Sequence, residues 1–311
     1  MADLMDPRAT FGEALLEIAE ENDKIVALSG DSSSGSGMSG LRDRFPDRHI
    51  EMGIMEQGII GYASGLATTG LIPFVAAIAP FVTVRPFEMF RNDLGYMKQN
   101  VKVVGRSSGL TYSDLGATHQ SLDDIAIVRT IPGVTVINPG CPLEIRRAVR
   151  AAAEHLGPVY IKIGSPKMPV LSADKDHFEI GKSVQYFDGE DVTIIACGVV
   201  FSKAHDAAEI LQQRGVSVQL INMHTIKPID VDAILAAAKR TGRIVTVEEH
   251  YLHGGLGGAV AEVLAKYHPT PMKMIGVDDQ FAGNGPYEEL IALYGLQGDQ
   301  IADAVQEFLK G

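Results

Sequence analysis

The sequence predicts an α/β protein made of two doubly wound domains, each with a mostly parallel sheet. Short β-rich runs alternate with helical segments along almost the whole chain, which is typical of parallel sheets covered by helices on both faces. A charged, Pro-bearing segment at residues 164–180 has no strong period and interrupts the alternation. With 311 residues, of which 46% are hydrophobic, the chain is long enough for two cores.

In the first block, apolar residues at helical spacing alternate with short buried runs. Leu15, Ile18 and Ala19, for example, recur at the spacing of one helix face. The predicted helices are residues 9–22, 54–69, 121–131 and 142–156, and the predicted strands are residues 24–30, 100–105, 134–138 and 159–164. We predict a first domain at residues 1–170 and a linker at 171–185.

The second block repeats the alternation on a smaller scale. Its predicted strands are residues 191–198, 216–224 and 243–250, and its predicted helices are residues 203–215, 230–242 and 254–267. We predict that it forms a second domain at residues 186–311.

Composition argues against several classes of partner. The formal net charge is −12, and the sequence shows no clustered Lys and Arg of the kind that binds nucleic acid or anionic membranes. Only Cys141 and Cys197 are present, which is too few for a disulfide framework. The N-terminal residues lack the apolar region of a signal peptide, and no run reaches about 18 apolar residues. These features favour a cytoplasmic protein that binds small molecules or other proteins.

One carboxylate stands in an apolar, glycine-rich run. Glu56 lies near the start of the predicted helix 54–69, in GIMEQGIIGYASGLA. Gly58, Gly61 and Gly65 share one face of that helix, and each lowers helix stability by about 1 kcal/mol relative to alanine, so we expect a backbone or a flat ligand to approach them closely. Glu56 is therefore either a buried carboxyl that can share a proton or a solvated residue of the first helical turn.

The order of motifs resembles transketolases and deoxyxylulose-phosphate synthases. The resemblance runs through GIMEQGIIGYASGLATTGLIPF, then GATHQSLDDIAIVRTIPGVTVINPGCPLEIRRAV and GPVYIKIGSPKMPV, and covers most of residues 10–170. The second block resembles the C-terminal domain of the same family through INMHTIKPID and VEEHYLHGGLGGAVAEVL. Several motifs in the same order are more specific than any one of them.

The resemblance implies roles for four residues. Glu56 matches the glutamate that shares a proton with the aminopyrimidine ring of thiamine diphosphate, and Phe81 matches the aromatic residue that stacks on that ring. Asp31 matches, more weakly, an aspartate near the thiazolium side of the cofactor. His119 matches a histidine that hydrogen-bonds the donor oxygen and assists proton transfer. From the residues alone, Phe81 could equally be a core aromatic and His119 a structural residue before a helix.

Three positions depart from the family pattern. Ser107 aligns with a histidine and Ser165 with an arginine that recognise sugar phosphates, and Leu115 aligns with an acid that contacts donor hydroxyls. A phosphate group usually needs cationic or bidentate partners, so we expect the substrate to differ from the standard pentose phosphates. A shift of one or two residues in the alignment would allow a replacement cation from among Arg106, Lys162 and Lys167.

The resemblance also implies a partner. No Gly-Asp-Gly motif for magnesium and the diphosphate precedes residue 53, so we expect Mg²⁺ and the diphosphate to bind an N-terminal transketolase subunit, in an α2β2 assembly. The predicted activity is transfer of a ketol or related acyl group, with this chain inactive alone. The alternatives are the beta subunit of a 2-oxo acid dehydrogenase and a non-catalytic assembly subunit.

Two further motifs suggest other ligands. The glycines of GGLGG, residues 254–258, suggest a dinucleotide site, but they lack the G-x-G-x-x-G spacing, so we predict tight packing of a strand on a helix. The Glu-Glu-His run at residues 248–250 suggests a metal, but no third ligand is evident.

Overall fold

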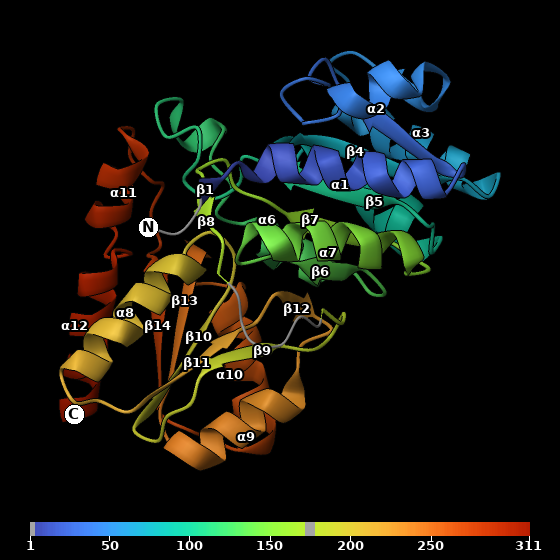
Figure 1. The fold of residues 1–311 in the computed structure, drawn as a ribbon. Coiled ribbons are helices and arrows are strands. Elements are labelled where there is room, and N and C mark those ends of the chain that lie inside the picture. The colour runs from blue at the N-terminus through green and yellow to red at the C-terminus, as the bar shows by residue number, and fades with distance from the viewer. Residues whose placement is uncertain (1–3, 172–177) are drawn as a thin grey trace.

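The protein has two mostly parallel β-sheets, each covered by helices on both faces (Figure 1). The computed structural model describes residues 4–171 and 178–311. The predicted α/β class is therefore confirmed. Of the predicted linker at 171–185, residues 172–177 lie outside the described residues, and the domain boundaries stay a prediction.

The first sheet has seven strands in the order β12-β6-β7-β5-β4-β2-β3. All neighbours pair in parallel except β12 and β6, which are antiparallel. The strands are β2 (Ile25–Ser29), β3 (His49–Glu51), β4 (Ile72–Ile78), β5 (Lys102–Arg106), β6 (Thr135–Ile137), β7 (Val159–Lys162) and β12 (Thr225–Lys227).

Helices cover both faces of this sheet. The helices on one face are α1 (Pro7–Glu21), α2 (Ser39–Arg44) and α7 (Pro142–Glu154). The helices on the other face are α3 (Glu56–Thr68), α4 (Ala79–Thr83) and α6 (Asp124–Arg129), with α5 (Phe87–Met89) and a π-helix at Phe90–Tyr96 following α4. Helix α1 begins two residues earlier than predicted, because the Asp6 side chain accepts hydrogen bonds from the first free N–H groups and Pro7 fits the first turn.

The second sheet has five strands in the order β14-β13-β10-β11-β9. Only β9 runs antiparallel to its neighbour. The strands are β9 (Val184–Phe187), β10 (Val192–Ala196), β11 (Val218–Asn222), β13 (Ile244–Tyr251) and β14 (Met272–Val277). The helices are α8 (Phe201–Gln213), α9 (Val231–Thr241), α10 (Leu256–Tyr267), α11 (Tyr287–Leu293) and α12 (Gly298–Lys310).

One apolar cluster extends across both halves of the chain. A continuous apolar cluster runs from α3 and the first sheet to α9 and α10 of the second half. Strand β12 follows β11 in sequence but joins the first sheet, where Lys227 Nζ donates hydrogen bonds to the backbone oxygens of Arg129 and Ile131. The alternation pattern did not predict this exchange, because β12 is too short to show a period.

The remaining short elements are an antiparallel pair, β1 (Leu4–Met5) with β8 (Met168–Pro169), and the 3-10 turns Pro46–Arg48 and Gly116–Thr118. Among the described residues, no helix has the length and apolar character needed to cross a membrane.

Candidate active site

Four predicted site residues follow neighbouring parallel strands at one edge of the first sheet. Asp31 follows β2, Phe81 follows β4, Ser107 follows β5 and Ser165 follows β7. Parallel strands place their carboxyl ends at the same edge, and open α/β sheets bind ligands there. The topology therefore gathers residues that are far apart in the sequence.

Glu56 is the first residue of α3 and is buried, with a relative exposure of 6%. Of the two predicted environments, the buried one is therefore observed. Arg85 Nη1 donates a hydrogen bond to Glu56 Oε2 at 2.8 Å, while 43% of the Arg85 side chain is exposed. The N-terminal end of α3 also favours a negative charge at this position. No described residue donates a hydrogen bond to the second oxygen of Glu56, so this oxygen is free for a ligand.

The glycine face of α3 has little packed against it within the described part of the chain. A Cβ at Gly65 would meet no atom within 4 Å, and one at Gly61 would lie 3.5 Å from the Asp93 carboxylate. A Cβ at Gly58 would meet only the flexible Met55 side chain. The close neighbour expected for these glycines is thus not supplied by the described residues.

Phe81 contacts both Arg85 and His119. The Arg85 guanidinium lies 4.0 Å from the centre of the Phe81 ring, a cation–π contact, and the half-buried Phe81 meets the His119 ring edge-on with centroids 5.3 Å apart. Phe81 is therefore no ordinary core aromatic. Thr118 Oγ1 and His119 Nδ1 lie 2.9 Å apart, within hydrogen-bond distance. The arrangement places an aromatic face and an imidazole beside a buried carboxyl.

Tyr112 extends this series of contacts, which runs from Glu56 through Arg85 and Phe81 to His119, as far as Arg106. The Tyr112 ring lies 6.1 Å from the His119 ring, and its hydroxyl accepts a hydrogen bond from Arg106 Nη1 at 2.9 Å. Burial alone would raise the pKa of Tyr112, but the hydrogen bond and charge of Arg106 lower this pKa overall.

Arg106 is a buried cation whose described contacts are all neutral. Its relative exposure is 4%, Nε donates to Ser36 Oγ at 2.8 Å, and Nη1 also reaches Ser107 Oγ at 3.4 Å. No carboxylate of the described residues lies in an ion pair with it. A buried guanidinium without a counter-ion is costly, and an anionic ligand would remove much of that cost.

Ser107 and Ser165 meet at the far end of the series. Their hydroxyl oxygens lie 2.7 Å apart, and Ser107 is fully buried with a left-handed backbone (φ 53°). Left-handed backbone is uncommon for a serine, and such strain concentrates at functional sites.

Asp31 and Leu115 do not join this series. Asp31 is exposed, has a left-handed φ of 62°, and donates its N–H to the Glu51 carboxylate. Leu115 is 49% exposed, and its described hydrogen bond runs from its N–H to the Tyr112 oxygen. The structure brings the other five predicted residues into one line of contacts and leaves these two at the margin.

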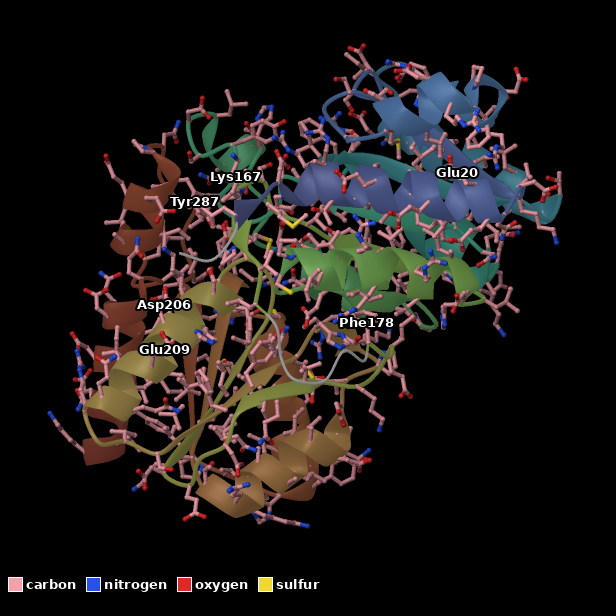
Figure 2. All side chains as sticks on the ribbon, viewed as in Figure 1. Glu20, Lys167, Phe178, Asp206, Glu209 and Tyr287 are labelled. Carbon is pink, nitrogen blue, oxygen red and sulfur yellow. The ribbon has the colours of Figure 1, made fainter. Side chains whose placement is uncertain are left out.

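The two alternative lysines have different surroundings. Lys162 is buried and paired with Asp124 at 2.7 Å, so its charge is already balanced, whereas Lys167 is exposed (Figure 2). Of the three cations considered from the sequence, Arg106 is the one that touches the predicted site residues.

The glycine motif forms tight packing, as predicted, and leaves no room for a dinucleotide phosphate. Glu248 accepts hydrogen bonds from the N–H groups of Leu256 and Gly257 at 2.6 and 2.7 Å, which occupies the start of α10. A Cβ at Gly255 would lie 2.0 Å from the Glu248 carboxylate. The neighbouring His250 has its Nδ1 2.7 Å from the Tyr251 oxygen, so residues 248–250 do not converge on a metal.

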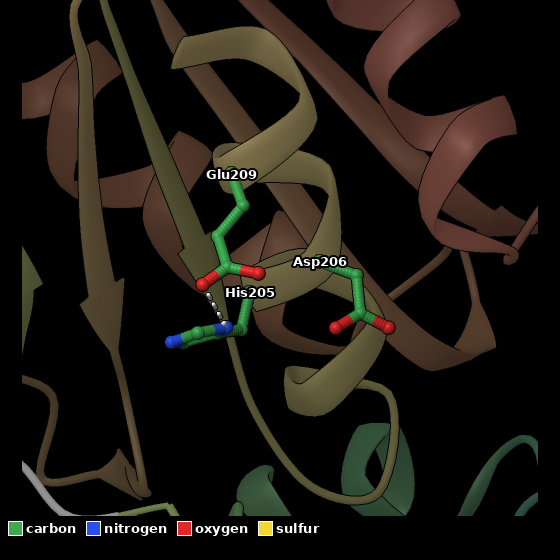
Figure 3. A group of neighbouring side chains, drawn as sticks. All are labelled: His205, Asp206 and Glu209. Atoms are coloured by element: carbon green, nitrogen blue, oxygen red, sulfur yellow. Dashed lines mark ion pairs between the residues drawn. The ribbon is translucent and has the colours of Figure 1, made fainter. Parts of the chain in front are cut away.

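One surface group has the composition of a metal site. His205, Asp206 and Glu209 lie on α8, where Figure 3 shows His205 and Glu209 facing each other while the Asp206 carboxylate points to the other side. Exposed acidic groups of this kind are common, and the group lies on a helix of the second half rather than at the active-site edge.

The sequence alone did not single out Arg85 or Tyr112. Arg85 is 29 residues from Glu56, and only the chain reversal after β4 brings the two together. Tyr112 stands in an irregular loop without periodicity. An arginine four residues after the predicted stacking aromatic was the one available signal.

The chain is similar to transketolases over almost its whole length. Its residues 4–168 match the pyrimidine-binding domain of transketolase, and residues 181–301 match the transketolase C-terminal domain. An apulose-4-phosphate transketolase subunit of Phocaeicola vulgatus is 38% identical over 97% of both chains. The 6-deoxy-6-sulfo-D-fructose transketolase subunit SqwH of Clostridium sp. is 37% identical over 96% of this chain and 93% of its own.

A solved structure has the same fold. A split-gene transketolase, described as an inactive β4 tetramer, superposes with a TM-score of 0.92 at 39% identity and covers 98% of this chain and 99% of its own. These matches favour transketolase over the dehydrogenase alternative. The chain belongs to the transketolase family, as a subunit that comprises its pyrimidine-binding and C-terminal domains.

Proposed function

We propose that this chain supplies the pyrimidine-binding half of a thiamine-diphosphate-dependent transketolase whose substrate carries an anionic group. The observation that carries the proposal is the unbroken line of contacts from Glu56 through Arg85, Phe81 and His119 to Tyr112, Arg106, Ser107 and Ser165. It joins a carboxyl suited to the cofactor with a cation suited to a substrate.

The residues at one end of this line fit the aminopyrimidine ring. Glu56 is shielded from water, keeps one oxygen free of described donors, and can hold or release a proton at that oxygen. Phe81 offers a ring to stack on, with Arg85 exposed enough to move aside. Thiamine diphosphate would supply the nucleophilic carbon that carries the ketol group. His119 would hydrogen-bond the donor oxygen and move protons there, and Asp31 would lie on the thiazolium side.

An N-terminal partner subunit would complete the site. The relatives named above as transketolase subunits support a partner subunit. In this proposal the partner would hold Mg²⁺ and the diphosphate, in an α2β2 assembly. Ile54, Met55, Tyr62 and Val84 are exposed apolar residues on or near α3 and α4, beside Glu56. Apolar residues gathered in one region often mark an interface. We also infer a cytoplasmic location, which the two free, buried cysteines support.

Arg106 would bind the anionic end of the substrate. Ser107 and Ser165 would then contribute hydroxyls in place of the cations of the usual pattern, and Leu115 would leave one donor hydroxyl without an acidic contact. Two relatives act, by their names, on a sugar phosphate and on a sulfonated sugar, and a guanidinium can bind either group. We therefore propose a phosphorylated or sulfonated ketose outside the standard pentose phosphates.

Calorimetric titration of thiamine diphosphate with Mg²⁺ tests the shared site. We expect no binding to this chain alone and micromolar or tighter binding to its mixture with the N-terminal subunit. Strong binding to this chain alone would contradict the divided site, and absence of binding in a verified assembly would contradict the cofactor.

A substrate panel then tests the reaction. The assembled enzyme is offered a sulfonated ketose, branched and linear ketose phosphates, and unphosphorylated ketoses, with an aldose phosphate as acceptor. We expect turnover of at least one anionic ketose at a higher kcat/KM than its neutral counterpart. Efficient turnover of xylulose 5-phosphate with ribose 5-phosphate would refute the unusual substrate while leaving the transketolase assignment intact.

A further inference from the structure

The loop that carries the predicted substrate residues is irregular and needs external support. Residues 107–121 contain Ser107, Leu115 and His119, and four of the residues in this loop have a positive φ: Ser107, Gly109, Tyr112 and Gly116. A short antiparallel bridge between Gly109 and Ser121 closes its base. A loop without regular hydrogen bonding gains its shape from whatever packs against it.

The second half of the chain supplies that support at the buried end of the loop. Leu110 N–H donates a hydrogen bond to Glu249 Oε1 at 2.6 Å, and Tyr287 of α11 donates its hydroxyl to Glu249 Oε2 at 3.0 Å. Glu249 is 5% exposed. A Cβ at Gly109 would lie 2.4 Å from the Glu249 carboxyl carbon, so loop and carboxylate are in direct contact.

Segment 283–285 holds the outer part of the loop. Gly285 N–H donates to the Ser113 oxygen at 3.2 Å, and Gln120 Nε2 donates to the Gly283 oxygen at 2.9 Å. A Cβ at Gly116 would lie 2.5 Å from Asn284 Oδ1, which leaves no space for a side chain there. In Figure 1 this loop, drawn in green, lies beside the red α11, from which Tyr287 projects (Figure 2).

We propose that Glu249 is a positioning residue, through which the C-terminal domain fixes loop 107–121 and so aims His119 and Ser107. This inference rests on the proposed function, because it assigns the loop a role in catalysis. The described hydrogen bonds of Glu249 run to Leu110, Tyr287 and Lys162, and none of them involves Glu56 or Phe81. It acts on the loop through the backbone of Leu110, at a point three residues from Ser107.

The neighbouring Glu248 offers a matched control. Both glutamates are buried on β13 and both accept backbone hydrogen bonds, but Glu248 binds the start of α10 and Glu249 binds the loop. The variants are Glu249→Ala, which removes the contact, Glu249→Gln, which keeps one acceptor oxygen, Tyr287→Phe, which removes one donor, and Glu248→Gln as the control.

Hydrogen exchange of the amides in residues 109–119 is measured first, on this chain and on the assembly. Losing this buried hydrogen bond should speed exchange there about tenfold in Glu249→Ala, less in Tyr287→Phe, and little in Glu248→Gln. Unchanged exchange in Glu249→Ala overturns the proposal. If Glu249→Ala fails to fold, Tyr287→Phe decides the same question.

Kinetics and cofactor binding follow on the assembly. Because misplacement of catalytic groups by about 1 Å can cost a hundredfold, we expect kcat/KM to fall about 10- to 100-fold in Glu249→Ala, with partial rescue in Glu249→Gln and unchanged thiamine diphosphate affinity. Equal losses in Glu248→Gln, or a parallel loss of cofactor affinity, would reduce Glu249 to a purely structural role. An inactive wild-type assembly would refute the proposed function, while the exchange data would still decide whether Glu249 holds the loop.

Discussion

Glu56 and Glu249 are both buried glutamates, but their surroundings differ. Glu56 begins a helix at the molecular surface and lies beside exposed apolar residues. Its one described side-chain partner is Arg85, which is partly exposed. Glu249 lies between the two halves of the chain, and both of its carboxylate oxygens accept hydrogen bonds. Burial raises its pKa to about 7.

On the proposed function, the difference separates a site that binds other molecules from a contact that is complete within the chain. A carboxyl with a free oxygen and an exposed border can accept a cofactor and a partner subunit, whereas a fully bonded carboxyl can only hold what it already touches. The chain therefore holds its loop with a carboxylate whose two oxygens are both hydrogen-bonded, whereas the proposed cofactor site at Glu56 keeps one oxygen without a described donor.

Of the variants that test this difference, Glu56→Gln should have the largest effect on activity. Proton sharing by a positioned carboxyl contributes about 100- to 10,000-fold to rate, so we expect kcat of the assembled enzyme to fall within that range while assembly persists. Steady-state kinetics and sedimentation measure the two effects. Glu154→Gln, an exposed change on α7, is the control. Undiminished activity in Glu56→Gln would favour the non-catalytic assembly subunit.

His119→Asn should have the next largest effect. An asparagine can still hydrogen-bond an oxygen but cannot carry a proton at neutral pH, so we expect kcat to fall about 100-fold and KM to change little. A variant that changes KM alone would show that His119 only binds substrate.

Arg106→Gln should weaken substrate binding rather than chemistry. Hydrogen bonds between charged partners contribute about 1.5–3 kcal/mol, which predicts a 10- to 100-fold rise in KM for an anionic ketose. The KM of a neutral ketose should change far less. Equal effects on both substrates would place the anion elsewhere, and Lys167→Gln would then be the next variant to assay.

Glu249→Gln should have the smallest effect, on the pH dependence of stability. The pKa of folded Glu249 is about 7, above its ordinary value of 4.5, so its favourable contribution is present below about pH 4.5 and is lost as the pH rises through 7. Relative to wild type, the variant should therefore gain about 1–3 kcal/mol between pH 5 and pH 8. Denaturant unfolding at both pH values measures this gain.

Lys162, Asp124 and Tyr287 act on the Glu249 carboxyl and are present in both proteins, so their effects on the difference largely cancel. A pH-independent difference between variant and wild type would show that Glu249 is not neutralised on folding.

The sequence was informative where a local pattern or a motif decides the outcome. Alternating β-rich and helical runs predicted both sheets, and the motif around Glu56 predicted its helix, which spans Glu56–Thr68 rather than 54–69. The long apolar segment 71–82 divides into strand β4 and the start of helix α4, because Pro80 fits the first turn of that helix. The predicted helix 121–131 shortens to Asp124–Arg129.

Contacts between distant segments could not be predicted in this way. The pairing of Arg85 with Glu56 and the neutral surroundings of Arg106 depend on how loops fold over the sheet edge. The contact of Glu249 with Leu110 joins residues 139 apart in the chain. A local motif can mark a residue such as Glu56, but it does not identify the distant residue that contacts it.

Strand β12 also protects an edge of the first sheet. Because Thr225–Lys227 pairs with β6, one edge strand of the first sheet comes from the second half of the chain. A fragment that ended near residue 170 would expose the backbone N–H and C=O groups of β6, and such bare edges invite self-association. Within the intact chain β12 covers this edge, so dividing the chain between its two halves would remove that cover.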